Sequence, residues 1–186
     1  PAPALAPSKP LPAKRPRTEA NLTSVSEMTS AFISTCDATL SSLLSRHVFV
    51  GLLDDQQVLF QYESGLYLLT FPSLLPSALK WISLRDFGRY PTLSCHLPYA
   101  HLLSPAQLEL IRRFTPMYEE YFCLALQDDH VITFPVLIEG TRVSDSAILS
   151  FISQVALVAH DDEKSCLSTI LSLLLDTISP PVSDHE

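Results

Sequence analysis

Apolar residues recur at helical spacing along the chain that follows residue 20. They predict one amphipathic helix from Leu22 to His47, with Thr23 or Ser24 as its N-terminal cap. Its apolar stripe consists of Val25, Met28, Phe32, Cys36, Leu40, Leu43 and Leu44. Such a stripe must pack against another element, so this helix is expected to cover part of a core.

Three short apolar runs come next, Val48 to Leu53, Gln57 to Tyr62 and Leu66 to Phe71. Asp54-Asp55 and Ser64-Gly65 between them are turn residues, so the runs predict an antiparallel meander. Nearly every position is apolar instead of alternating with polar residues, which predicts a sheet covered on both faces. A layer of helices can cover only one face, so a second cover is needed.

Strand alternation divides the apolar side chains of the meander into two expected faces. One face has Val48, Val50, Leu52, Leu59, Leu66 and Leu68, and the other has Phe49, Leu53, Val58, Phe60, Tyr67 and Leu69. A monomer would leave one set in water, although burying a large apolar side chain contributes roughly 1.5–3 kcal/mol. The meander therefore predicts association with another chain. The residues expected to contact that partner are Val50, Leu52, Val58, Phe60, Tyr67 and Leu69.

Proline and glycine mark the next elements. Pro72 and Pro76 open a helix that should run to about Phe87, where Gly88 and Pro91 end it. Ser104-Pro105 opens another predicted helix to about Phe114, and Pro116 is expected to start a separate short turn.

The last third of the chain completes the pattern. The runs 122–127 and 131–134, joined by Asp128-Asp129-His130, predict a hairpin. Residues 147–158 are apolar and fit either a strand or a helix, and Asp161 is expected to cap a helix that ends at Ile178. A meander, helices, a hairpin and a final helix in this order predict an α+β fold.

Charge is distributed unevenly over the 186 residues, whose net charge is −8. The first twenty residues contain six prolines and four basic residues, so they predict a disordered linker. Within it, Lys14, Arg15 and Arg17 fit a nuclear import signal or, alternatively, solubilising charge. From position 21 onward there are eight basic and 19 acidic residues, a net of −11. This excess should repel DNA, so tight DNA binding by the folded part is not expected.

Candidate chemistry is sparse. Four glycines leave no phosphate-binding loop, and four scattered cysteines without a CxxC pair indicate neither a zinc site nor a disulfide framework. Cys95-His96, with His101 and Cys123 or His130, matches no metal-ligand spacing, and Pro98 suggests that these residues lie in a loop. No signal peptide and no apolar run of about 20 residues is seen, so a soluble, non-secreted protein without membrane contact is expected.

From Asn21 onward the sequence resembles the C-terminal region of the eukaryotic MutL homologue that is the shared, nuclease-lacking subunit of mismatch-repair heterodimers. The resemblance is ungapped over 47–51, over Gln56, Leu59, Gln61 and 66–69, and at Asp86-Phe87. With gaps it continues through Tyr121-Phe122, Leu124, Pro135, Leu137, residues 161–164 and Cys166.

This resemblance implies an α+β domain of two subdomains, with a dimerisation part at about 21–90 and 147–186 and an inserted external part at about 91–146. It implies DNA mismatch repair in the nucleus, heterodimerisation with a PMS-type MutL paralogue, and docking of repair proteins through short peptides. It implies no cofactor and no catalytic activity in this chain.

Two departures from relatives bear on catalysis and completeness. Nuclease-bearing paralogues have an Asp-Gln-His-Ala motif that supplies metal ligands, but the corresponding residues here are Phe60-Gln61-Tyr62-Glu63. Asp55-Gln56-Gln57-Val58 looks similar but lies in the preceding turn. The sequence ends at Glu186, whereas the family it resembles continues through further dimerisation elements. The alternatives to an interaction module are a metal-dependent endonuclease domain of the same superfamily and an unrelated α+β scaffold.

Overall fold

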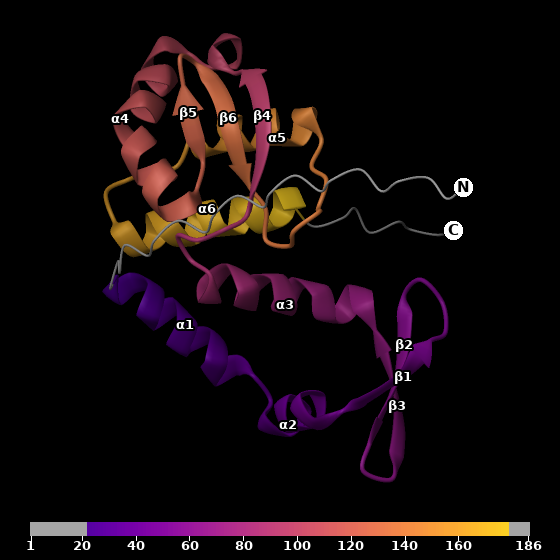
Figure 1. Cartoon of the computed structure of the whole chain (residues 1–186). Helices are drawn as coiled ribbons and strands as arrows, with labels where there is room; N and C mark the ends of the chain where they lie inside the picture. The colour runs from indigo at the N-terminus through magenta and orange to yellow at the C-terminus, as the bar shows by residue number, and fades with distance from the viewer. Residues whose placement is uncertain (1–21, 179–186) are drawn as a thin grey trace, which may run out of the picture.

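The computed structural model describes residues 22–178, and within them six α-helices and two three-stranded antiparallel sheets form the predicted α+β fold (Figure 1). The basic cluster Lys14, Arg15 and Arg17 lies outside the described residues. In chain order the elements are α1 (Thr23–Thr35), α2 (Ala38–Arg46), β1 (Val48–Leu52), β2 (Gln57–Tyr62), β3 (Gly65–Thr70), α3 (Phe71–Arg85), β4 (Thr92–Pro98), the 3₁₀ turn η1 (Ala100–Leu102), α4 (Pro105–Phe122), β5 (Ala125–Gln127), β6 (His130–Pro135), α5 (Asp145–Val155) and α6 (Glu163–Ile178).

The predicted meander is confirmed as the first sheet, in which β2 lies between β1 and β3. The β2–β3 pairing is regular and ends at Tyr62 opposite Gly65, which leaves a two-residue turn. The β1–β2 pairing is not regular, because its register shifts between Phe49 and Gly51.

This β-bulge corrects the expected division of the sheet into faces. Strict alternation grouped Leu52 with Leu59, but the extra residue at Val50 places Leu52 opposite Val58. Leu52 therefore shares a face with Val58 and Phe60. Sequence periodicity cannot reveal such a slip, since a one-residue shift reverses every side chain beyond it.

The single long helix predicted from Leu22 to His47 is wrong, because the chain breaks it at Cys36 and Asp37. The Asp37 carboxylate accepts a hydrogen bond from the Leu40 amide at 2.8 Å and so starts α2 as its N-cap. Neither Thr23 nor Ser24 caps α1, whose N-cap is Leu22. The hydroxyl of Ser24 instead donates to Glu163 Oε1 of α6 at 2.7 Å.

The second sheet has the strand order β4-β6-β5. The predicted hairpin is confirmed as β5 and β6, with Asp128 and Asp129 both at positive φ, as tight two-residue turns require. Its first strand is shorter than the predicted 122–127, because α4 continues to Phe122 and β5 begins only at Ala125. β4 was not predicted, and Cys95 and His96 lie in this strand instead of in a loop. Pro98 ends the strand, where a missing N–H costs little.

Two helical predictions need correction, and the choice between strand and helix for residues 147–158 is resolved. α4 continues through Pro116 to Phe122, because burial of Ile111, Tyr118 and Phe122 outweighs one missing backbone hydrogen bond. Residues 145–155 are helical, with Ser144 as the N-cap of α5. Asp162, not Asp161, caps α6, since its carboxylate accepts from the Ser165 amide at 2.7 Å.

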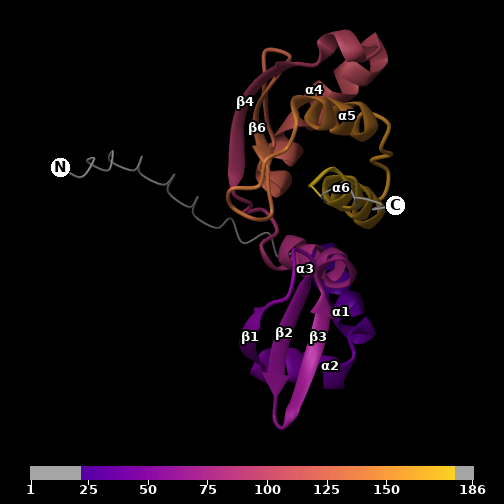
Figure 2. The same cartoon turned by 90° about the vertical axis from the view of Figure 1, so that its right-hand side faces the viewer.

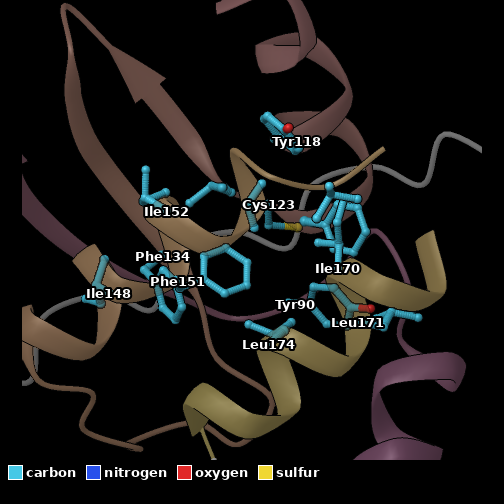
Figure 3. Close-up of a cluster of buried hydrophobic side chains, with 14 of the residues drawn as sticks. Tyr90, Tyr118, Cys123, Phe134, Ile148, Phe151, Ile152, Ile170, Leu171 and Leu174 are labelled. Carbon is cyan, nitrogen blue, oxygen red and sulfur yellow. The ribbon is translucent and has the colours of Figure 1, made fainter. Parts of the chain in front are cut away.

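The main core lies between the second sheet and α4, α5 and α6, and Figure 3 shows side chains from these elements converging there. The rings of Phe134 in β6 and Phe151 in α5 meet edge to face, with centroids 5.3 Å apart. The proposed subdomain boundary at residue 147 therefore falls inside a helix that packs on the second sheet. In both views α6 lies between this part and α3, with the meander on the far side of α3 (Figures 1 and 2).

Candidate interaction surface

Exposed apolar side chains concentrate on the meander and the residue that follows it. Of the fifteen large apolar residues that are exposed in the described part of the chain, nine lie between positions 48 and 71. We call these nine the apolar patch: Val48, Phe49, Val50, Leu52, Leu53, Leu66, Tyr67, Leu68 and Phe71. Large apolar side chains exposed close together are typical of interaction sites.

The patch includes residues from both faces of the meander, because Phe49, Leu52 and Tyr67 share the face of Phe60 whereas Val48, Leu66 and Leu68 lie on the opposite face. Figure 1 shows α1, α2 and α3 on one side of the sheet, and Figure 2 views the opposite side, where no other element of the described chain lies in front of the strands. On the covered side, Phe60 is stacked on Tyr67 at 5.6 Å between centroids and contacts the His47 ring edge-on at 5.5 Å.

The register assigns residues to the uncovered side. Leu59 pairs with Leu68, and Gln61 pairs with both Leu66 and Val48, so these side chains share the face opposite Phe60. We call this the open face. Val48, Leu66 and Leu68 are 63%, 67% and 54% exposed. These three side chains form an apolar surface on a rigid sheet.

The six residues predicted to contact a partner divide into two groups. Val50, Leu52 and Tyr67 are exposed, and Leu69 is half-buried. Val58 and Phe60 are buried inside the chain, at 8% and 4% exposure, because β2 is the central strand and its alternate residues point at the helices. A rigid partner could not reach these two. Val48, Leu66 and Leu68, which the sequence grouped on one face, are not among the six predicted contacts but are exposed on the open face.

The two four-residue segments that were compared with the nuclease motif, 60–63 and 55–58, both lie in or beside the strands of the meander. Phe60 is a buried core ring, Tyr62 is half-buried, and Glu63 occupies the β2–β3 turn with φ at +52°. Asp55-Gln56-Gln57-Val58 spans the preceding turn and the start of β2, where the Asp54 carboxylate accepts from the Gln56 amide at 2.7 Å. These positions serve the fold of the meander.

The other candidate ligands are placed by the second sheet. His96 and His130 stack with ring centroids 4.3 Å apart, and the Cys95 thiol donates to the Val131 carbonyl at 3.5 Å. Burial, followed by the charge of Asp145, raises the pKa of Cys95, which favours the protonated thiol over the metal-binding thiolate. Cys123 is buried, and within residues 22–178 no group of three or more potential ligands is close enough to hold a metal ion.

A shallow depression of about 470 Å³ lies beside the β5–β6 turn, bordered by Tyr99, Arg112, Leu126 and Asp129. Arg112 makes a bidentate contact with Asp129, with the shortest N–O distance at 2.7 Å. The depression has charged groups at its rim and is remote from the apolar patch along the chain.

Among the described helices, none is long and apolar enough to cross a bilayer.

The α+β architecture, with two small antiparallel sheets packed against helices, is the class of fold expected for the C-terminal region of a MutL homologue. The family model described as "DNA mismatch repair protein Mlh1 C-terminus" matches residues 21–108 and 103–182. Because these segments together span most of the sequence, the chain belongs to this family of mismatch-repair C-terminal domains.

Proposed function

We propose that this chain is the heterodimerisation and partner-docking module of a MutL homologue in nuclear DNA mismatch repair. Its partner is a PMS-type MutL paralogue, and it binds through the apolar patch of the meander. The observation that carries the proposal is the open face, on which Val48, Leu66 and Leu68 are all more than half exposed.

The energetics favour an obligate partner. Burying a partly exposed apolar side chain contributes about 1–2 kcal/mol, so Val48, Leu66 and Leu68 on the open face supply about 3–6 kcal/mol, and each further patch residue that the partner covers adds a similar amount. Joining two chains costs an estimated 4–15 kcal/mol, and the partner's own apolar surface adds to the favourable side. A surface of this type resembles half of a protein core, as obligate interfaces do.

We further propose that the chain carries no catalytic centre. Support comes from the residue at the first motif position: Phe60 has no ligand atom and lies inside the core. The net charge of −11 from residue 21 onward supports the view that duplex DNA is not held directly by this region. We propose that the basic cluster near the N-terminus directs nuclear import. Short peptides of repair proteins are proposed to bind to the surface of the external part, and the depression beside Arg112 is a candidate site for them.

The test compares two apolar-to-charged substitutions in the full chain, co-expressed with a PMS-type paralogue. Leu66→Glu places a carboxylate in the open face, whereas Leu157→Glu places one at a residue that is 73% exposed and lies after α5, away from the meander. Both variants should fold, because neither side chain is buried. We expect Leu66→Glu to abolish co-purification and Leu157→Glu to preserve it. Equal recovery of both variants with the partner would refute the proposed interface.

A further inference from the structure

Helix α1 packs on α3 and α6, and its first two turns are joined to the start of α6 by two polar pairs (Figure 1). The Ser24 hydroxyl donates to Glu163 Oε1 at 2.7 Å, and the Lys164 ammonium donates to Glu27 Oε2 at 2.7 Å. Ser24 and Glu27 are three residues apart, so they lie on one face of α1. We call these four residues the α1–α6 contact.

Little else fixes the beginning of α1. No residue of this helix is buried, and its N-cap, Leu22, provides no side-chain hydrogen bond. Val25, Met28 and Phe32 are only partly buried against the main core. A helix end with few buried contacts and no cap opens locally at low free energy. Ser24, which is half-buried while the α1–α6 contact is closed, therefore becomes accessible to an enzyme when the first turn opens.

We propose that Ser24 is a phosphorylation site and that its phosphate releases the start of α1 from α6. A protein kinase transfers the γ-phosphoryl group of a nucleoside triphosphate to Ser24 Oγ. The new Oγ–P bond replaces the bond between the γ-phosphorus and the bridging oxygen, the nucleoside diphosphate leaves, and the hydroxyl proton passes to a base of the kinase. This regulatory site does not depend on the heterodimer proposed above.

The phosphate would turn attraction at the α1–α6 contact into repulsion. A serine hydroxyl donates a hydrogen bond, whereas a phosphoserine offers acceptor oxygens and adds a charge of about −1.5 to −2 at neutral pH. The chain entering α6 already has Asp161, Asp162 and Glu163 beside one cation, Lys164, which is paired with Glu27. Like charges at contact distance would therefore replace a charge-assisted hydrogen bond.

The sequence after Ser24 suits a kinase that selects an acidic residue three positions later, since Glu27 is at that position. Among the described residues, Ser34 and Ser83 have the same spacing. Ser83 is fully buried, and the Ser34 hydroxyl bonds to the Ala31 carbonyl of its own helix. What distinguishes Ser24 is a hydroxyl that bonds another helix, so a phosphate there acts directly on tertiary structure.

Phosphoserine installed by genetic code expansion at position 24 or 26 of the full chain tests the effect. Ser26 is exposed on the same helix but lies two residues away, so it does not share the face of Ser24 and adds the same charge away from α6. Phosphoserine at 24 should speed amide exchange at Met28 and Phe32 by about tenfold or more, as expected when a charge-assisted hydrogen bond is lost, and phosphoserine at 26 should not. Equal exchange in the two proteins, or slower exchange with phosphoserine at 24, would overturn the release of α1.

A substitution in α6 identifies the group that the phosphate meets. Glu163→Gln removes the carboxylate but keeps an oxygen that can accept from the unmodified Ser24 hydroxyl. In the chain with phosphoserine at 24, this substitution should bring exchange at Met28 and Phe32 several-fold back towards the unmodified rate. Unchanged fast exchange would show that the phosphate does not act through Glu163 and would contradict the proposed mechanism.

A separate experiment asks whether Ser24 is modified. The full chain is incubated with magnesium ATP and a protein kinase that selects serine with an acidic residue three positions later, and phosphopeptides are mapped by mass spectrometry. We expect phosphate on Ser24, and its loss from that peptide in Ser24→Ala. Phosphate on Ser34 alone, or on no residue of α1, would overturn the assignment of the site.

Discussion

Truncation of Phe60 should show most clearly which residues of the meander belong to the core and which to the surface. It is 4% exposed, stacks on Tyr67 and contacts the His47 ring. Leu52, on the same side of the sheet by register, is 65% exposed. Because sequence periodicity alone assigned both residues to the partner interface, their truncation tests the structural distinction directly.

Phe60→Ala should destabilise the chain by about 3 kcal/mol. Buried Phe→Ala substitutions cost about 3–5 kcal/mol, and the lower end applies because Tyr67, which is 39% exposed, can move into the space that is left. Leu52→Ala should change stability by no more than about 0.5 kcal/mol, as surface substitutions do. In a chain of this size the first effect corresponds to a melting point lower by about 6–12 °C.

Urea unfolding followed by fluorescence of Trp81 suits this comparison. Trp81 is the only tryptophan and stacks on Phe32 at 6.2 Å, so it reports on the helices beside the meander. Circular dichroism on the same samples checks that the two probes lose structure together. If Phe60→Ala and Leu52→Ala had equal unfolding midpoints, Phe60 would not be a core residue and the assignment of covered and open faces would be wrong.

Three further predictions concern other parts of the chain. His160 stacks on Phe114 and hydrogen-bonds Tyr118, and burial lowers its pKa, so the unfolded chain binds the proton more readily than the folded chain. Stability should therefore fall as pH drops below about 6.5. In acid-unfolding curves His160→Gln should reduce that fall. The chain should neither nick DNA with manganese nor bind duplex tightly at physiological salt; salt-sensitive tight binding after removal of residues 1–20 would contradict the charge argument. Changing Lys14, Arg15 and Arg17 together to Ala should reduce nuclear accumulation of a fluorescent fusion, and unchanged accumulation would count against an import signal there.

Local chemistry made the meander predictable. Asp54-Asp55 and Ser64-Gly65 are strong turn signals, and the three strands begin and end within one residue of the expected positions. The α+β class followed from the order of elements. The open face was also foreseeable, since a sheet that is apolar at nearly every position needs two covers.

The errors arose where one residue or tertiary packing decides the outcome. Asp37 interrupts an otherwise continuous apolar stripe, and the bulge at Val50 reverses the side of Leu52 without any signal in composition. Pro116 would break an isolated helix, but the buried residues of α4 hold it in place. The contrast between Phe60 and Leu68 required knowledge of which face the helices cover. Periodicity separates two faces but does not say which is inside.

The central claim is that the open face of the meander is where the partner subunit binds. Cross-saturation from an unlabelled PMS-type paralogue to this chain, deuterated and methyl-labelled, measures contact at individual side chains. We predict strong intensity losses at the methyl groups of Val48, Leu66 and Leu68, and none at Ile138 and Leu157, which are exposed outside the apolar patch. Losses at Ile138 or Leu157 with unaffected Val48, Leu66 and Leu68 would contradict the account and move the interface away from the meander.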